Sequence, residues 1–454
     1  MSQRAPIAPN FTVEDRRSAC PGLFRMAKAL DGAICRVKLT FGEFSAEQAR
    51  QVAEAAEKFG NGIIEITNRA NLQIRGVRAE TEALLIAALL DAGLGPLTDR
   101  GDDVRNVMVS PVAGVDHALV DVRPLALRLL TALQLNAGYQ TLSPKFSVLV
   151  DGGETVAMVE HPHDIWVSPI DPESKTSQFA FGIAGVPPTG RDDRPALGRV
   201  NGDEVFAVVT SIIDLFLEWS RGNPAASRMR HFLADIGEAD FLQQLERGLG
   251  HSVGHDASAP WLRRQPRAHG HLGVLIESAS TFLIGAMPPL GHLDPDVLVA
   301  LAALAQEQGN GHLRLTPWQS ILLPGIATAG AQSVLARLEA LGLHSDPETP
   351  LATMISCSGS AGCGSALAAT QADGFKLAAL LGPTSASPQI HVSGCMKSCA
   401  SPGTRPITLV ATAPGHYDIF LQATNGPSRF GKLLAANVTI EEAADLIGKN
   451  FGAS

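Results

Sequence analysis

Residues 42–76 read GEFSAEQARQVAEAAEKFGNGIIEITNRANLQIRG, and residues 291–325 read GHLDPDVLVALAALAQEQGNGHLRLTPWQSILLPG. The two segments align without a gap at a constant offset of 249 residues, and both carry the triplet Gly-Asn-Gly at the same place. Self-similarity at a fixed spacing is the signature of a duplicated structural unit. The sequence therefore predicts two copies of one supersecondary unit.

Local signals predict the order strand, helix, hairpin in each copy. Ser45 with Gln48 predicts a capping box before a helix over 46–59. Asp294 followed by Pro295 begins the matching helix, and the Gly-Asn-Gly triplets predict left-handed turns that end both helices. Strands are predicted at 33–41, 63–67, 72–75, 313–316 and 321–323 and within 273–287. Two such ferredoxin-like half-units are expected to pair across a pseudo-twofold axis.

A different kind of segment follows each copy. The first is predicted to hold a helix near 124–137, a strand over 145–150, a surface loop over 185–198 and a helix near 203–219. The second is predicted to hold helices over 364–381 and 440–449, the latter after a capping box from Thr439 to Glu442. The expected fold class is α+β, with half-units at 15–95 and 259–344, a first α/β half without cysteines at 96–258, and a cluster-binding α/β half at 345–454.

Four of the six cysteines stand in the last segment as C-x5-C and C-x3-C, namely Cys357, Cys363, Cys395 and Cys399. Glycine- and serine-rich loops surround them, so backbone N–H groups can approach an inorganic cluster. Four thiolates are the ligand set of a [4Fe-4S] centre. A structural zinc site usually has two to four residues between paired ligands, so the five-residue gap fits zinc poorly. The pattern predicts an iron–sulfur site with these four ligands.

Other interpretations of the cysteines are less favoured. The N-terminus shows no secretory signal, and thiols in the cytosol are normally kept reduced, which argues against disulfides. The run Gly359-x-x-Gly362-x-Gly364 lacks the complete dinucleotide fingerprint. Cys20 and Cys35 are interpreted as ordinary apolar thiols.

Composition limits the class of function. The 454 residues carry 36 Lys plus Arg and 45 Asp plus Glu, for a net charge of −9 without a block of like charge. This balance argues against nucleic-acid and membrane-surface binding. The sequence contains no apolar run of about 18 residues, so we expect no membrane span. We expect a soluble, cytoplasmic protein of two to four domains.

The plan and its motifs resemble the sulfite and nitrite reductase family over nearly the whole chain. Ile66-Thr-Asn-Arg69-Ala-Asn-Leu-Gln73 is similar to the family's T-T-R-Q-x-x-Q, Arg105-Asn-Val-Met to its R-N-V-M, and Leu142-Ser-Pro-Lys145-Phe-Ser147 to its L-P-R-K-F-K. In that family a duplicated ferredoxin-like unit alternates with two cluster-domain halves, and a [4Fe-4S] cluster lies beside siroheme. The resemblance implies this fold, and it implies catalytic contacts to the inorganic anion from Arg69, Arg105 and Lys145.

Departures from the family pattern point to one of its branches. Ser147 stands where the second lysine belongs, Ala70 replaces a glutamine, and Gly394-Cys-Met-Lys-Ser-Cys399 replaces G-C-P-N-x-C. A site that reduces sulfite or nitrite requires dense positive charge around the anion, so the loss of one cation in four argues against that reaction. The motif set, including H-V-S-G-C-x-K-x-C-x-x-P, resembles the precorrin-3B synthase branch.

The resemblance to this branch implies an oxygen-dependent monooxygenase of aerobic cobalamin biosynthesis. Members convert precorrin-3A to precorrin-3B by hydroxylating C20 and closing a γ-lactone, and they use a [4Fe-4S] cluster, a mononuclear non-haem iron, dioxygen and electrons from NADH. The sequence shows no nicotinamide loop, so an external NADH-linked electron donor is expected. The alternatives are a siroheme-dependent sulfite or nitrite reductase and a protein that carries a tetrapyrrole or electrons without turnover.

Siroheme and precorrin-3A are both polycarboxylate tetrapyrroles, so a pocket for one suits the other. Arginine binds carboxylates through two parallel hydrogen bonds. Strand alternation is expected to put Arg36, Lys38 and Thr40 on one face, with Gln73 and Arg75 in a second polar stripe. The predicted substrate contacts are Arg36, Lys38, Arg69, Gln73, Arg75, Arg105 and Lys145.

Ligands for the mononuclear iron are harder to find. His161-Pro-His163-Asp164 offers two imidazoles and a carboxylate, as a facial triad does, and a solvated turn is the alternative. His391 and the pair His251 and His255 are further candidates. Lys397, between two predicted cluster ligands, either raises the cluster potential or points to solvent.

Overall fold

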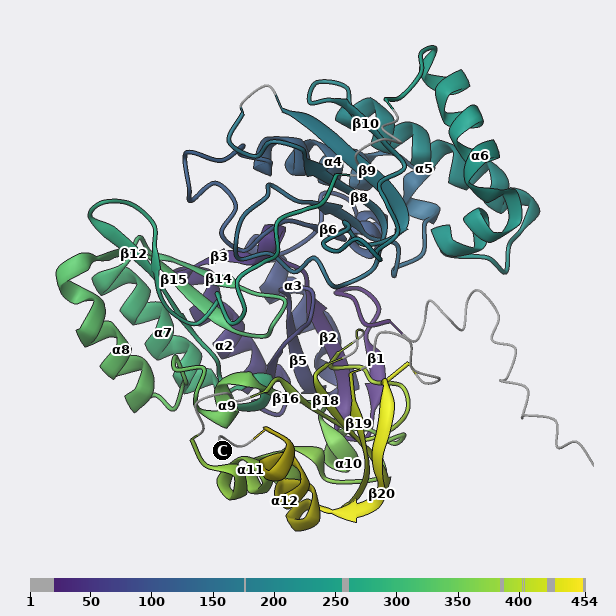
Figure 1. Cartoon of the computed structure of the whole chain (residues 1–454). Coiled ribbons are helices and arrows are strands. Elements are labelled where there is room, and N and C mark those ends of the chain that lie inside the picture. Colours follow the sequence, from purple (N-terminus) through teal and green to yellow (C-terminus); the bar gives the residue numbers. More distant parts are fainter. Residues whose placement is uncertain are drawn as a thin grey trace, which may run out of the picture.

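The computed structural model describes residues 20–174, 177–254, 261–383, 388–401, 403, 405–422 and 429–451. The described residues form four five-stranded sheets with helices packed on them (Figure 1). This α+β fold confirms the predicted class. No helix among the described residues is long and apolar enough to cross a membrane.

The two ferredoxin-like sheets exchange one strand each. The first has the order β1-β2-β5-β4-β13 and the second the order β11-β12-β15-β14-β3, so each ends in a strand from the other copy. All pairs within them are antiparallel. The bounds are β1 Ala27–Ala29, β2 Gly32–Val37, β3 Glu43–Ser45, β4 Ile64–Ile66, β5 Leu72–Val77, β11 Gly273–Ile276, β12 Thr281–Ala286, β13 His292–Leu293, β14 His312–Leu315 and β15 Ile321–Ala327. The exchange makes the two copies one structural body with pseudo-twofold symmetry.

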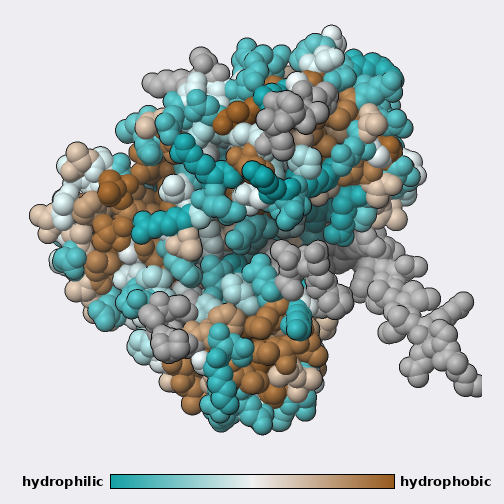
Figure 2. Space-filling view, viewed as in Figure 1, coloured by the Kyte–Doolittle hydropathy of each residue, from teal (hydrophilic) through white to brown (hydrophobic). Residues whose placement is uncertain are grey.

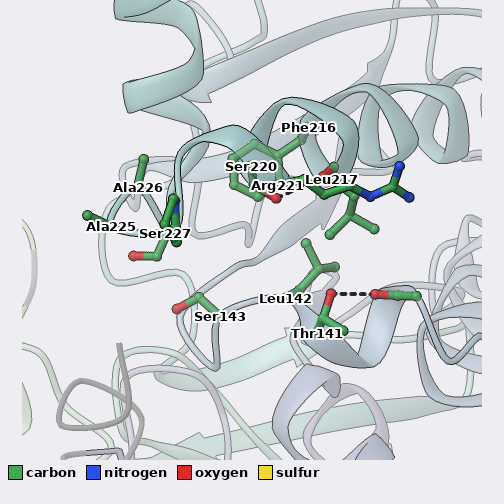
Figure 3. A pocket seen from close by; sticks show the side chains of 12 residues that line it. Thr141, Leu142, Ser143, Phe216, Leu217, Ser220, Arg221, Ala225, Ala226 and Ser227 are labelled. Atoms are coloured by element: carbon green, nitrogen blue, oxygen red, sulfur yellow. Dashed lines mark hydrogen bonds between the residues drawn. The ribbon is translucent and has the colours of Figure 1, made fainter. Parts of the chain in front are cut away.

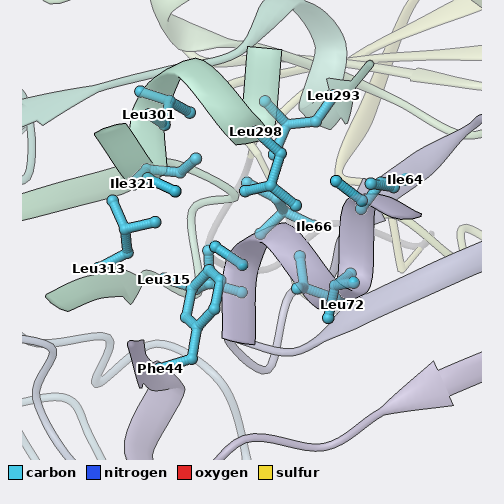
Figure 4. Close-up of a cluster of buried hydrophobic side chains, with 14 of the residues drawn as sticks. Phe44, Ile64, Ile66, Leu72, Leu293, Leu298, Leu301, Leu313, Leu315 and Ile321 are labelled. Atoms are coloured by element: carbon cyan, nitrogen blue, oxygen red, sulfur yellow. The ribbon is translucent and has the colours of Figure 1, made fainter. Parts of the chain in front are cut away.

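Helices α2 (Ala46–Phe59) and α7 (Pro295–Gln308) occupy the same places in the two copies, at the 249-residue offset of the sequence repeat. Two further helices keep the offset, α3 (Glu82–Asp91) and α8 (Ala331–Ala340). Buried aliphatic side chains of both copies meet in one core, which Figure 4 shows with Leu298 and Ile66 among its members. The predicted pairing of two half-units is therefore confirmed.

The helix starts follow the predicted signals. The Ser45 side chain accepts a hydrogen bond from the backbone of Gln48 and the reciprocal bond is present, so the capping box is confirmed. Pro295 occupies the first turn of α7, although the Asp294 side chain makes no capping bond.

In the Gly-Asn-Gly triplets that end the two helices, Gly62 and Gly311 are left-handed with φ 81° each. The predicted left-handed turns are therefore confirmed, and within the first one Gly60 is extended with φ −107°.

The strand predicted over 33–41 ends earlier, at Val37. Phe41 takes φ 57° in the short helix η1 (Thr40–Gly42), and Leu290 takes φ 54° in the equivalent η5 (Pro289–Gly291). These left-handed residues turn the chain so that β3 and β13 can cross to the other sheet. The predicted strand face that included Lys38 and Thr40 is therefore wrong.

The two α/β halves repeat one topology as well. Their sheets have the orders β6 to β10 and β16 to β20, and each has three parallel strands followed by two antiparallel ones. The strands are β6 Val107–Met108, β7 Val148–Val150, β8 His163–Pro169, β9 Gln178–Gly185, β10 Gly198–Asn201, β16 Met354–Ser356, β17 Ile390–Ser393, β18 Ile407–Ala413, β19 His416–Leu421 and β20 Lys432–Thr439. The pseudo-symmetry thus extends to the whole described fold.

Helices cover these two sheets. The first half has α4 Arg123–Leu135, α5 Val205–Gly222 and α6 Met229–Leu249, and the second has α9 Pro350–Thr353, α10 Gly359–Gly362, α11 Thr370–Leu381 and α12 Ile440–Phe451. The loop predicted over 185–198 and the Thr439–Glu442 capping box are both present. The helix predicted from 364 begins later, at Thr370, and the strand predicted from 145 begins at Val148.

The surface of the second α/β half is partly apolar. Figure 2 shows brown residues gathered over the lower part of the molecule, where Figure 1 places this half. The exposed large apolar side chains there are Leu367, Phe375, Leu380, Met396 and Leu433. Met396 lies in the loop that carries the last two cysteines, so that loop reaches the surface.

Candidate iron–sulfur and tetrapyrrole site

The four predicted cluster ligands lie in loops that one edge of a sheet brings together. Cys357 follows β16, Cys363 follows α10, and Cys395 and Cys399 follow β17. Because β16 and β17 are parallel neighbours, their carboxyl ends meet at the same edge. The backbone N–H of Gly394 donates to Cys357 Sγ at 3.2 Å, which joins the two loops directly.

The thiols are close enough to influence one another. Burial raises the pKa of the Cys399 thiol, and the neighbouring Cys395, Cys357 and Cys363 raise it further. All four are free thiols. A Cβ at position 394 would lie 2.6 Å from Ala366 Cβ and 3.3 Å from Cys357 Sγ, so the glycine allows the two cysteine loops to pack closely. The donor set and its surroundings fit a [4Fe-4S] cluster held by these cysteines.

Lys397 connects the two cysteine loops. Its Nζ donates to Ser365 Oγ at 2.9 Å, and its carbonyl accepts from Arg429 at 3.1 Å. Lys397 is exposed as well, so both predicted roles, raising the cluster potential and pointing to solvent, stay predictions. The positive charge lies between the loops that hold Cys363 and Cys395.

Arg75 joins the first half-unit to the first cysteine loop. Its side chain is only 3 % exposed and pairs with Asp31 at 2.8 Å and with Glu65 at 3.2 Å. A further bond runs from its Nη2 to the carbonyl of Gly362, next to Cys363, at 2.9 Å. Two carboxylates and a carbonyl thus occupy this guanidinium, and the arrangement positions the cysteine loop.

Arg36 and Arg69 are placed differently. Arg36 donates to Gln73 Oε1 at 2.6 and 3.1 Å, and Arg69 makes only long contacts, to Asn106 Oδ1 at 3.3 Å and to the carbonyl of Lys145 at 3.4 Å. Within the described part of the chain, neither guanidinium pairs with a carboxylate. Burial and the nearby charges of Arg36 and Arg228 lower the pKa of Arg69 to about 10. Asp164 pairs with Arg228, and its charge and that of Glu65 act on Arg69 and Arg36 only from a distance, so both guanidiniums keep N–H groups for an anionic ligand.

The remaining predicted cations either donate to backbone carbonyls or have a side chain on the surface. Lys38 Nζ donates to the carbonyls of Asp102 and Asp103, and burial lowers its pKa to about 8. Arg105 donates to the carbonyl of Lys38 at 2.7 Å and to that of Leu94 at 3.3 Å. Lys145 has an exposed side chain. Of the seven predicted contacts, the structure brings Arg36, Arg69 and Gln73 together.

The segment proposed for a mononuclear iron does not fit that role. Asp164 accepts bonds from the backbone of Ser147 at 3.0 Å, from the backbone of Met229 at 2.9 Å and from Arg228 Nε at 3.0 Å. The described residues, the four cysteines among them, contain no group of three or more His, Cys, Asp and Glu side chains suited to one metal ion. In a [4Fe-4S] cluster each cysteine binds a different iron, so this absence bears on a single-ion site and not on the cluster. His251 pairs with Glu204 at 3.3 Å on the surface, and His255 lies outside the described residues.

The structure brings together several buried polar residues that the sequence did not predict to lie near one another. His163 and His391 have both ring nitrogens buried without a hydrogen-bond partner among the described residues. Arg405, 5 % exposed, donates to Ser401 Oγ at 2.9 Å and adds positive charge near His391. His271 stacks on Trp318 with ring centroids 4.6 Å apart. A cavity of about 20 Å³ is lined by Trp318, His271 and Arg405. No motif in the sequence joins these residues, because they come from four distant segments.

The buried histidines predict an acid-sensitive fold. Burial, with smaller contributions from nearby positive charges, lowers the pKa of His163, His271 and His391 to about 3. The unfolded chain binds these protons near pH 6.5, so the stability they contribute is present above about pH 6.5 and is lost as the pH falls toward 3. Each contributes a slope of about 1.4 kcal/mol per pH unit.

Urea unfolding between pH 7 and pH 4.5 measures this dependence. The free energy of unfolding is expected to fall steeply with acidification, and a His163→Gln variant is expected to show a slope shallower by about one proton. Equal slopes for the two proteins would contradict the assignment of His163 as a buried neutral ring.

A pocket among the described residues lies away from the cysteines. It has a volume of about 390 Å³ and is bordered by α5 and by the loops at 141–143 and 224–227. Figure 3 shows Leu142 and Leu217 on opposite sides of it. A second cavity, of about 20 Å³, is lined by Arg69 and Arg105. The large pocket thus borders the segment that carries Lys145 without including a predicted contact.

Comparisons with known proteins agree with the fold. The family model "Nitrite/Sulfite reductase ferredoxin-like half domain" matches residues 28–92 and 276–341, and "Nitrite and sulphite reductase 4Fe-4S domain" matches residues 100–253. The second match covers the half without cysteines. The structure of the Mycobacterium tuberculosis NirA protein superimposes with a TM-score of 0.73 over 91 % of this chain and 79 % of that one, at 22 % identity.

Two relatives cover most of the chain. The chloroplastic ferredoxin–nitrite reductase of Zea mays is 31 % identical over 83 % of this chain and 69 % of its own length. The precorrin-3B synthase of a Sinorhizobium species is 28 % identical over 97 % of this chain and 93 % of its own. The fold, the half-domain matches and the maize relative together place the protein: the chain belongs to the nitrite and sulfite reductase family of iron–sulfur oxidoreductases.

Proposed function

We propose that this chain is a precorrin-3B synthase, which hydroxylates C20 of precorrin-3A and closes a γ-lactone. The Sinorhizobium relative supports the proposal because the alignment runs nearly end to end in both chains. The maize nitrite reductase is matched over about two thirds of its length.

The observation that carries the proposal concerns the four positions that match the anion-binding cations of the reductases. It is how each of these side chains is bonded and exposed in this structure. Ser147, in place of a lysine, is 3 % exposed and hydrogen-bonds Asp164 through its backbone. Arg105 donates to two backbone carbonyls, and Lys145 points its side chain to the surface. Among the described residues, Arg69 alone of these positions offers a half-buried guanidinium without a carboxylate partner. A six-electron reduction of a small oxyanion requires more charge than one such group supplies.

Arg36 and Arg69 suit a tetrapyrrole better. Two neighbouring guanidiniums can each bind a peripheral carboxylate of the substrate, and Gln73 orients Arg36 through its Oε1. Glu65 accepts from Gln73 Nε2 at 2.8 Å and so fixes the orientation of the amide. The carboxylates of such a substrate bring the negative charge that would neutralise the positive charge of Arg36 and Arg69.

The proposed reaction consumes one dioxygen and two electrons for each substrate. One oxygen atom enters at C20 and the other leaves as water, and the electrons come from an external NADH-linked donor. The [4Fe-4S] cluster, when bound to the four cysteines, supplies electrons one at a time. We propose no protein ligands for a mononuclear iron, because Asp164 is already engaged by Arg228 and backbone donors.

The second candidate is a siroheme-dependent nitrite or sulfite reductase. The 31 % identity to the maize enzyme favours it. Anaerobic purification from cells that make siroheme separates the two functions. The proposal predicts the visible spectrum of an iron–sulfur cluster without a siroheme band, and no reduction of nitrite or sulfite by reduced methyl viologen. Stoichiometric siroheme with turnover of either anion would establish the reductase instead.

A further inference from the structure

Two equivalent turns of the internal repeat contact the chain beside the last cysteine. Asn68, in the turn between β4 and β5, donates through Nδ2 to the carbonyls of Cys399 at 3.2 Å and Ala400 at 3.3 Å. Gln319, in the equivalent turn between β14 and β15, donates through Nε2 to the carbonyl of Ala400 at 3.2 Å. Two amide groups from the two half-units thus hold one peptide segment.

The first turn is rigid, which fixes the direction of its amide. Thr67 Oγ1 accepts the backbone N–H groups of Arg69 at 3.3 Å and Asn71 at 3.1 Å, and Ala70 takes φ 53°. The Asn71 side chain accepts from the backbone of Leu39 at 2.8 Å, which anchors the turn to the rest of the half-unit.

The second turn repeats this construction. Thr316 Oγ1 accepts from the backbone of Trp318 and Ser320, both at 3.2 Å, and Gln319 takes φ 70°. Gln319 is 4 % exposed, so its amide is held inside the molecule. The two turns therefore present their amides from fixed positions to the same segment of the cluster half.

The residue at position 68 differs from the family motif in a way that matters for this contact. The reductase pattern T-T-R-Q has threonine where this chain has Asn68. A threonine side chain is shorter and has no amide N–H group to donate to these two carbonyls.

We propose that Asn68 and Gln319 are positioning residues that raise the reduction potential of the cluster through the Cys399–Ala400 segment. Their N–H groups offset the partial negative charge of the two carbonyls and hold the peptide that carries the Cys399 thiolate. A reduced cluster is more negative than an oxidised one, so a less negative surrounding favours reduction. This inference rests on the proposed binding of a [4Fe-4S] cluster by the four cysteines.

Three substitutions at position 68 test the inference on the full-length, cluster-containing protein. Asn68→Thr installs the residue of the reductase motif, Asn68→Asp keeps the shape but replaces the donor with a negative oxygen, and Asn68→Gln keeps a donor. The matched control is Asn450→Ala, which removes an exposed amide that donates to the carbonyl of Leu446 at 2.7 Å, far along the sequence in α12.

The readouts are the midpoint potential from an anaerobic dye-mediated titration and the EPR signal of the reduced cluster. We expect Asn68→Thr to lower the potential, Asn68→Asp to lower it further, and Asn68→Gln and Asn450→Ala to stay near the wild-type value, with equal iron and sulfide in all proteins. Equal potentials in Asn68→Thr, Asn68→Asp and wild type would overturn the inference. A wild-type protein without any cluster signal would contradict the proposed function instead.

Discussion

A Cys395→Ser variant is expected to lose the iron–sulfur cluster and all activity that depends on it. Cys395 follows β17 in the loop that also carries Cys399, and the Gly394 N–H beside it already bonds Cys357 Sγ. A serine hydroxyl is a hard, protonated ligand that replaces a soft thiolate poorly. Iron and acid-labile sulfide in the purified variant are expected to fall to a small fraction of the wild-type content, with loss of the visible cluster absorbance.

Cys20→Ser is the matched control for this change. Cys20 is a buried thiol outside the second α/β half, so its replacement is expected to leave iron, sulfide and the spectrum unchanged. Full cluster content in Cys395→Ser would refute the four-cysteine assignment. Bound zinc in place of iron in the wild-type protein would refute the assignment of these cysteines to an iron–sulfur cluster.

An Arg69→Gln variant is expected to bind precorrin-3A about 10- to 100-fold more weakly, because a hydrogen bond to a charged group contributes about 1.5–3 kcal/mol. The folded protein without substrate is not expected to lose stability. Arg69 is half-buried near Arg36 and Arg228, its pKa is lowered to about 10, and its contacts are long. Removing such a charge relieves repulsion rather than breaking an ion pair.

Arg105→Gln provides the contrast. Arg105 bonds the carbonyls of Lys38 and Leu94, so this variant is expected to unfold at lower temperature while its effect on binding is smaller. Anaerobic binding titrations with precorrin-3A and thermal unfolding of the substrate-free proteins separate the two roles. Unchanged binding in Arg69→Gln, or a loss of stability equal to that of Arg105→Gln, would contradict the assignment of Arg69 to the substrate.

The repeat made much of the fold predictable. The 249-residue offset located both central helices to the residue, because caps such as Ser45 with Gln48 and Pro295 act locally. The strand exchange of β3 and β13 was not predictable, since it depends on pairing between copies. The early end of β2 has the same origin, because the turn at Phe41 serves that exchange.

The site was predictable in part for a similar reason. The cysteine spacing is a local signal, and it identified loops that the parallel strands β16 and β17 do bring together. The direction in which each cation points is set by distant partners. Arg75 meets Asp31 and Gly362, and Arg105 meets Leu94, and no periodicity in the sequence reports these contacts. The cluster of His271, Trp318 and Arg405 was not predictable for the same reason, because its members are distant in the sequence.

We propose that a tetrapyrrole is the substrate of this chain and that dioxygen is the source of the new oxygen. The most direct measurement is mass spectrometry of the product after the cluster-loaded protein, precorrin-3A and a chemical or enzymatic electron donor react under ¹⁸O₂. The expected product is a hydroxylactone with one ¹⁸O atom in the hydroxyl group at C20. A product without the label, or unchanged precorrin-3A in the presence of an intact, reducible cluster, would contradict it.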